Sequence, residues 1–131
     1  MTAAQELGRF AEDTAAEYLV SIGWRVLARN VKNKYGELDI IALDAKTQPI
    51  ELVIAEVRCR TLGKIQAPLD TIGSRKLRTL LRASQDYVDD LNWSGFWRID
   101  VIGITLQDKN TLENWELEHV KDITSGINIS Y

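Results

Sequence analysis

The sequence has little cysteine and histidine. Its 131 residues include one of each, Cys59 and His119. A lone cysteine forms no disulfide within the chain and no multi-cysteine metal site, and a lone histidine builds no histidine-based metal centre or catalytic triad. We therefore expect Cys59 to pack in the core and His119 to have a surface or packing role. The scarcity of cysteine favours a reducing compartment, the cytoplasm.

Long hydrophobic runs are lacking too. The longest stretch without Asp, Glu, Lys or Arg is residues 123–131, which is nine residues, whereas a spanning helix needs about 20 apolar residues. The first ten residues contain Glu6 and Arg9 and show no secretory signal. GxGxxG and P-loop motifs are absent. These features predict a cytoplasmic protein with no membrane partner.

The size and composition are those of an ordinary globular protein. The chain is 45% hydrophobic and 27% charged, and its length suits one hydrophobic core. We expect one domain over residues 1–131, with a short C-terminal tail from about residue 123.

The formal net charge of −3 conceals two basic blocks. Residues 24–34 hold four cations and no acid, residues 58–82 hold seven cations and one acid, and residues 35–57 between them hold five acids and one lysine. A basic rim around an acidic centre is what a metal-dependent site acting on phosphates requires. Solvated surface faces would produce the same blocks.

Hydrophobic periodicity predicts an α/β protein. A first helix begins with a Thr2/Gln5 capping box and ends at Gly23, and a second helix extends from Leu77 to Leu91. A polar turn is expected over residues 30–35. Strands are expected at residues 24–29, 36–43, 51–60 and 96–106, with a final one at 115–120. The order is α-β-β-β-α-β, with the final strand in addition.

Acidic residues interrupt the second predicted strand. Because alternate residues of a strand share a face, Glu37 and Asp39 should face one way, and Leu38 and Ile40 the other. Acids among apolar neighbours are costly unless a metal, a cation or solvent compensates them. The pattern therefore marks this strand as a candidate site.

The third predicted strand carries charge in the same way. Glu56, Arg58 and Arg60 share one face within a largely apolar run. An aspartate on one strand and a glutamate on its neighbour suit Mg²⁺ or Mn²⁺ in phosphodiester cleavage, since Mg²⁺ takes one or two carboxylates plus water and phosphate oxygens. Cross-strand ion pairs on an exposed face would give the same pattern.

Several spaced motifs resemble a known family. They are GRFAE at 8–12, GW at 23–24, LARN at 27–30, GELDIIA at 36–42, AEVRCR at 55–60, Lys76 and RIDV at 98–101. In this order they resemble the YraN-like family of small bacterial proteins, a member of the restriction-endonuclease-like, or PD-(D/E)XK, nuclease superfamily. The resemblance covers about residues 6–104 and implies a restriction-endonuclease-like fold, a central mixed β-sheet flanked by two helices.

The resemblance also implies roles for individual residues. Asp39 and Glu56 correspond to the metal-binding acids of the nuclease core, with Mg²⁺ or Mn²⁺ as the expected cofactor. Glu12 of the first helix is expected to approach the same site as a catalytic residue. Glu37 is expected to be a supporting acid. Independently of the resemblance, Arg98 and Asp100 share a face of their predicted strand, so Arg98 is expected as a supporting residue that either pairs with Asp100 or contacts phosphate.

One position departs from the family pattern. Arg58 stands where the family and the superfamily usually have lysine. Lysine can shift its pKa and handle a proton, whereas arginine stays charged and is a poor general base. Arg58 can still clamp phosphate, and Lys76 is a candidate substitute if the second helix borders the site.

The expected partner is nucleic acid, and DNA in particular, with branched or damaged structures among the candidate substrates. Phosphate contacts without base preference are expected from Arg60, Lys64, Arg75, Lys76, Arg78 and Arg82. Two alternatives remain open. One is a catalytically inactive nuclease-fold module that binds nucleic acid or a protein, and the other is a protein-interaction domain without any nucleic-acid role.

Overall fold

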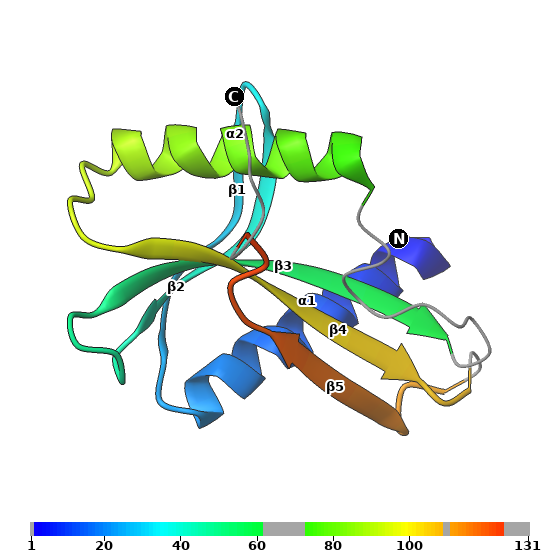
Figure 1. Cartoon of the computed structure of the whole chain (residues 1–131). Helices are drawn as coiled ribbons and strands as arrows, with labels where there is room; N and C mark the ends of the chain where they lie inside the picture. The colour runs from blue at the N-terminus through cyan, green and yellow to red at the C-terminus, as the bar shows by residue number, and fades with distance from the viewer. Residues whose placement is uncertain (1, 62–72, 109–110, 125–131) are drawn as a thin grey trace.

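The computed structural model describes residues 2–61, 73–108 and 111–124 (Figure 1). Two helices and five strands follow one another along these residues. Their bounds are α1 (Ala3–Ser21), β1 (Arg25–Asn33), β2 (Gly36–Asp44), β3 (Glu51–Thr61), α2 (Ser74–Asp90), β4 (Trp97–Leu106) and β5 (Trp115–Val120). The prediction of an α/β protein with the order α-β-β-β-α-β and a final strand is confirmed.

The strands form one mixed sheet in the order β1-β2-β3-β4-β5. β3 and β4 are parallel, and the other neighbouring pairs are antiparallel. The parallel pair requires a crossover, which α2 supplies between β3 and β4. The predicted mixed sheet flanked by two helices is therefore confirmed.

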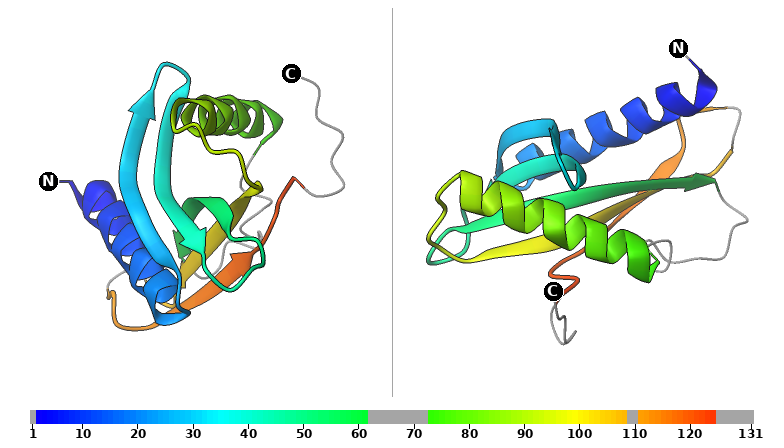
Figure 2. Two further views of the ribbon diagram at one scale, coloured as in Figure 1. Left: turned by 90° about the vertical axis from the view of Figure 1, so that its left-hand side faces the viewer. Right: turned by 90° about the horizontal axis from the view of Figure 1, so that it is seen from above.

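Each helix covers one face of the sheet (Figures 1 and 2). On one face α2 packs Leu80, Leu81 and Val88 against Ile54 and Ile99. The opposite face is covered by α1, whose three core residues are Ala11, Ala15 and Leu19. Strands buried on both faces explain the nearly continuous apolar runs in β3 and β4.

The first helix begins and ends as predicted. The Thr2 hydroxyl accepts a hydrogen bond from the Gln5 backbone N–H at 3.2 Å, and the Gln5 side-chain oxygen accepts one from the Thr2 backbone N–H at 2.9 Å. Together these two bonds form the capping box. After the helix, Gly23 adopts a φ of 89°, a left-handed conformation that favours glycine at a helix end.

The predicted polar turn at residues 30–35 is longer than the actual one. β1 continues through Asn33, which pairs with Gly36, and only Lys34 and Tyr35 form the turn of the β1–β2 hairpin. Polar side chains fit the outer part of this hairpin because it projects past the rest of the sheet (Figure 2). Polarity there marked an exposed strand and not a loop.

One prediction about β2 is wrong. Leu38 and Ile40 lie in different core clusters, one on each face, and not on a shared face. The β2–β3 pairing ends at Ile40 and Ala55, and beyond it the Asp39 carboxylate accepts the Val57 backbone N–H at 2.8 Å. The alternation therefore breaks at Asp39, where a side chain takes over a strand hydrogen bond.

A C-terminal tail is expected from about residue 123, but Ile123 itself packs in the core. Ile123 is 4% exposed in the core, and its backbone N–H donates to the Ile99 carbonyl at 2.8 Å. Residues 125–131 lie outside the described residues.

Candidate functional site

A pocket of about 360 Å³ opens where the β1–β2 hairpin departs from β3. Both helices and the three strands β1, β2 and β3 contribute to its walls. It brings together five of the residues that the sequence predicted for the site, which are Glu12, Glu37, Asp39, Glu56 and Lys76. Residues that are far apart in the chain therefore converge on one cavity.

Asp39 and Glu56 form the floor of this pocket. Asp39 is half-buried and keeps one carboxylate oxygen on the Val57 N–H, while Glu56 is only 4% exposed. The two carboxyl groups are close enough that the charge of Asp39 acts on Glu56. Two acids at the bottom of one pocket are an arrangement that folding alone does not favour.

The pKa of Glu56 shows how unfavourable this arrangement is. Burial, and then the neighbouring Asp39 carboxylate, raise the pKa of Glu56 from 4.5 to about 8. Lys76 and Arg58 act in the opposite direction but do not restore the ordinary pKa. Near neutral pH Glu56 therefore favours its protonated form far more than an exposed glutamate does, and added positive charge in the pocket would favour its ionised form.

Two cations approach Glu56 from different elements. Lys76 Nζ of α2 lies 3.8 Å from Glu56 Oε1, and Arg58 Nη1 of β3 lies 3.9 Å from the same oxygen. The condition that α2 borders the site is met, since Lys76 lines the pocket. The site therefore contains a lysine beside the acid pair even though position 58 is an arginine.

Glu12 reaches the pocket from α1 and is held by β1. Its Oε1 accepts from Arg29 Nε at 3.0 Å and from Asn30 Nδ2 at 2.9 Å. Asn30 has a φ of 53°, a conformation that asparagine adopts more readily than most residues. Sequence reasoning missed Arg29 and Asn30 as partners of Glu12, because nothing local links residues 12 and 30.

The pocket is acidic overall. Its described lining contains four carboxyl groups, those of Glu12, Glu37, Asp39 and Glu56, and one ammonium group, that of Lys76. Such a cavity repels a phosphate unless a cation sits between them. The electrostatics favour binding of a cation first.

Of the predicted phosphate-contacting residues, Lys76 lines the pocket, and the described lining does not include Arg60, Arg75, Arg78 or Arg82. Arg60 lines a smaller adjoining pocket with Arg58 and donates from Nε to Thr105 Oγ1 at 3.2 Å. The exposed α2 cations are Arg75, Lys76, Arg78 and Arg82. Lys64 lies outside the described residues.

Comparison with known sequences identifies the family to which this chain belongs. The model of the uncharacterised protein family UPF0102 matches residues 11–104, a span that contains Glu12, Asp39, Glu56 and Lys76. The chain belongs to the UPF0102 family. The resemblance to a family of small bacterial proteins is thereby confirmed.

Members of UPF0102 from distant bacteria are similar over most of their length. A UPF0102 protein of Chlorobium chlorochromatii is 36% identical over 119 residues, covering 89% of both chains. One from Mycobacterium tuberculosis is 39% identical over 120 residues, covering 90% of this chain and 91% of the relative. One from Marinobacter nauticus is 42% identical over 106 residues, covering 78% and 80%. Within the described residues, no helix is long and apolar enough to cross a membrane.

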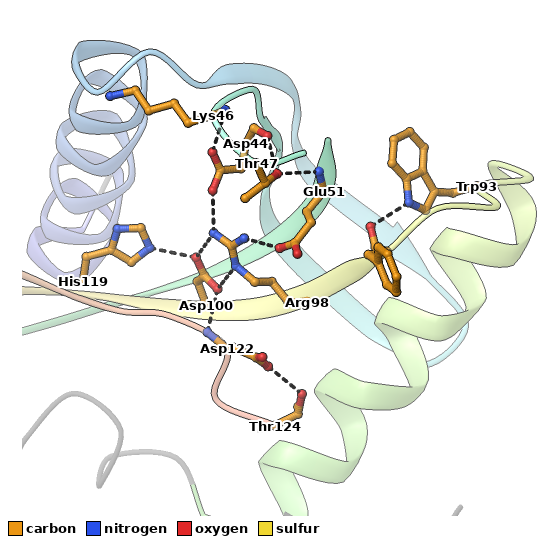
Figure 3. A network of polar contacts seen from close by, with 11 residues as sticks. Asp44, Lys46, Thr47, Glu51, Trp93, Arg98, Asp100, His119, Asp122 and Thr124 are labelled. Carbon is orange, nitrogen blue, oxygen red and sulfur yellow. Dashed lines mark hydrogen bonds and ion pairs between the residues drawn. The ribbon is translucent and has the colours of Figure 1, made fainter. Parts of the chain in front are cut away.

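Arg98 lies in a different cluster from the pocket residues of this UPF0102 protein (Figure 3). Its guanidinium contacts Glu51, donates to Asp44 at 3.1 Å and to Asp100 at 3.0 Å, and its side chain is only 10% exposed. The expected pairing with Asp100 is confirmed. Three carboxylates already contact the guanidinium, so nothing in this arrangement supports the alternative of phosphate contact by Arg98.

His119 belongs to the same cluster, which agrees with the packing role expected for it. Its Nε2 lies 2.8 Å from Asp100 Oδ2, and its Nδ1 lies 2.8 Å from the Tyr18 hydroxyl. Trp24 and Tyr18 both meet the imidazole ring edge to face. The cluster links α1, β4 and β5 and has a structural function.

The raised pKa of Glu56 predicts a pH-dependent cost of folding. The unfolded chain releases the Glu56 proton near pH 4.5 and the folded chain only near pH 8, so the wild-type protein loses stability as pH rises between these values. Glu56→Gln removes the titration. We expect this variant to be more stable than the wild type by a few kcal/mol at pH 8 and nearly equal at pH 5.

Urea unfolding at the two pH values measures this difference. Glu113→Gln, on an exposed residue, serves as the control and should show no such pH dependence. A Glu56→Gln variant that is equally stable relative to wild type at both pH values would contradict the electrostatic description of the pocket.

Proposed function

We propose that this UPF0102 protein is a metal-dependent nuclease-fold protein that binds nucleic acid, DNA in particular, and cleaves its phosphodiesters at the pocket. The observation that carries the proposal is the acid pair itself: Glu56 is buried, and the half-buried Asp39 carboxylate beside it raises its pKa further. Proteins retain such costly pairs mainly at functional sites. The restriction-endonuclease-like resemblance assigns the same two residues.

The donor set of the pocket fits Mg²⁺ or Mn²⁺. Carboxylate oxygens are the ligands these ions prefer, and Mg²⁺ binds through one or two carboxylates while water and substrate phosphates complete its shell. Within residues 2–61, 73–108 and 111–124 no cluster of three or more His, Cys, Asp or Glu is arranged as a metal site. Asp39 and Glu56 would thus hold the ion with phosphate oxygens as further ligands, and a bound ion activates water and stabilises charge on phosphate.

Side chains of the pocket would supply the orientation, the proton exchange and the positive charge that cleavage also requires. The Val57 N–H holds the Asp39 carboxylate in one orientation. Binding an ion through the other carboxylate oxygen would therefore cost little conformational entropy. Lys76 lies beside Glu56 and is the residue able to exchange a proton near the attacked phosphate. Arg58 contributes permanent positive charge to the same carboxylate.

The surface of α2 supports a polyanionic partner. Arg75, Arg78 and Arg82 are exposed on the helix that carries Lys76 into the pocket. Contacts of this kind act on backbone phosphates, weaken with salt and do not distinguish bases. Nucleic acid is the polyanion that also offers the phosphodiesters suited to the acid pair.

A second candidate is a catalytically inactive module that binds nucleic acid or a protein partner. The observation that favours it is Arg58, which occupies the strand position of the usual lysine and cannot act as a base. The two candidates differ in whether Lys76 serves in place of a strand lysine.

Cleavage of linear and branched DNA in Mn²⁺ by the wild type, Lys76→Met and Arg58→Lys distinguishes these candidates. If the protein is an enzyme, the wild type cuts, and Lys76→Met loses at least about tenfold in rate, since a positioned acid or base contributes roughly 10²–10⁴-fold. If only Arg58→Lys cuts, the native protein is an inactive module. Absence of both cleavage and salt-sensitive binding would overturn the proposed function and leave a protein-interaction domain.

A further inference from the structure

The acid pair lies deep between two helices. Glu56 is 4% exposed, and the walls of its pocket come from Gly8 and Ala11 of α1 on one side and from Lys76 and Thr79 of α2 on the other. The volume of about 360 Å³ is near the lower end for small-molecule pockets, ~300–1,000 Å³. A double helix, whose major groove alone admits a whole α-helix, is too wide to enter it.

The pocket continues into a second groove along α1. This groove has a volume of about 720 Å³ and shares four lining residues with the pocket, which are Gly8, Glu12, Asn30 and Glu37. It adds Gln5, Arg9, Asp13 and Arg29 to the path, and Arg29 is paired there with Glu12 and Asp13. Because they share these lining residues, pocket and groove together form a continuous path from α2 across the acid pair to the N-terminal half of α1.

Positive charge lies at both ends of this path. At the α2 end Lys76 lines the pocket, and Arg75 is exposed directly before it in the helix. At the α1 end Arg9 is exposed and lines the groove. Cations at the two ends and acids in the middle match a chain of phosphates of which only the central one needs a bridging cation.

From this path we infer that the site acts on single-stranded nucleic acid, as a free strand or as an unpaired tail or flap, and not on intact duplex. The inference rests on the proposed function and specifies its substrate class. One flexible strand follows this path and brings one phosphate to the acid pair, whereas a rigid duplex remains at the rim.

Gly8 allows the path to be blocked without damage to the fold. It is exposed in α1 and lines both cavities, and a Cβ at this position meets no heavy atom within 4 Å. Gly8→Leu should therefore stabilise the helix while its side chain obstructs the path. Ala4→Leu, at an exposed α1 position outside the described pocket linings, is the matched control.

The experiment measures fluorescence anisotropy of labelled probes in Ca²⁺ with wild type, Gly8→Leu and Ala4→Leu. The probes are a single-stranded DNA, an RNA of the same sequence, the blunt DNA duplex and the duplex with a single-stranded tail. We expect the single-stranded and tailed probes to bind at least about tenfold more tightly than the blunt duplex, and Gly8→Leu alone to remove that advantage. The DNA and RNA arms identify which strand is preferred.

The outcomes separate this inference from the proposed function. Equal or tighter binding of the blunt duplex, or single-strand binding that Gly8→Leu leaves unchanged, overturns the inference while nucleic-acid binding stands. If none of the probes binds at low salt, both the nucleic-acid function and the inference fail.

Discussion

Asp39→Ala is expected to weaken Mn²⁺ binding by at least about 100-fold, because removal even of groups that only support a metal ligand costs roughly 10–100-fold. Asp39 supplies one of the two carboxyl groups of the acid pair, so the variant leaves the buried Glu56 as the single acid of that pair. Cleavage, where the wild type shows it, should fall with binding. Calorimetric titration of Mn²⁺ at pH 8 provides the measurement.

Asp39→Asn is the matched control for folding. Its amide oxygen can still accept the Val57 N–H, which the wild-type carboxylate accepts at 2.8 Å, so the β2–β3 junction is preserved while the charge is lost. We expect the Asp39→Asn variant to fold as well as the wild type and to lose Mn²⁺ binding to the same extent as Asp39→Ala. Wild-type affinity in Asp39→Asn would exclude Asp39 as a metal ligand.

Arg98→Met is expected to destabilise the protein by about 3–5 kcal/mol, the usual cost of removing one partner from a buried ion cluster. The side chain is 10% exposed and is held by Asp44, Glu51 and Asp100, of which Asp100 is fully buried. Without Arg98, these carboxylates repel one another at close range. Such a loss is a large fraction of the ~5–15 kcal/mol that stabilises a typical domain.

Urea unfolding at pH 7 measures the effect, with Arg25→Met as the control. Arg25 is exposed on β1, and its removal should change stability by less than about 0.5 kcal/mol. If Arg98→Met also stays within this range, the cluster has no structural role. Metal binding by the folded fraction should be unchanged, because the lining described for the Asp39 pocket does not include Arg98.

The order of elements was predictable because local patterns determine it. The Thr2 and Gln5 capping box marks the start of α1, and apolar residues at helical spacing mark the buried face of α2. Prediction failed where local and tertiary preferences differ. The polar residues after Arg29 belong to a projecting hairpin, and the alternation of β2 breaks at Asp39 because its side chain replaces a strand partner.

The candidate site was partly predictable for a related reason. Asp39 and Glu56 stood out because charge within an apolar strand has an energetic cost that the sequence makes visible. Arg98 looked similar, yet its charge is balanced by carboxylates of β2, β3 and β4. Sequence alone could not separate these cases, since both consist of charged residues in buried strands.

By itself the sequence determined the fold class, the family and the two acids that the fold must accommodate, since each depends on residue type and short-range spacing. Only the tertiary structure decided which charges meet. It brought Lys76 and Glu12 to the acid pair and tied Arg98 to three carboxylates elsewhere. Electrostatic interactions depend on distance and burial across elements far apart in the chain, so the arrangement of the site emerges only when both helices pack on the sheet.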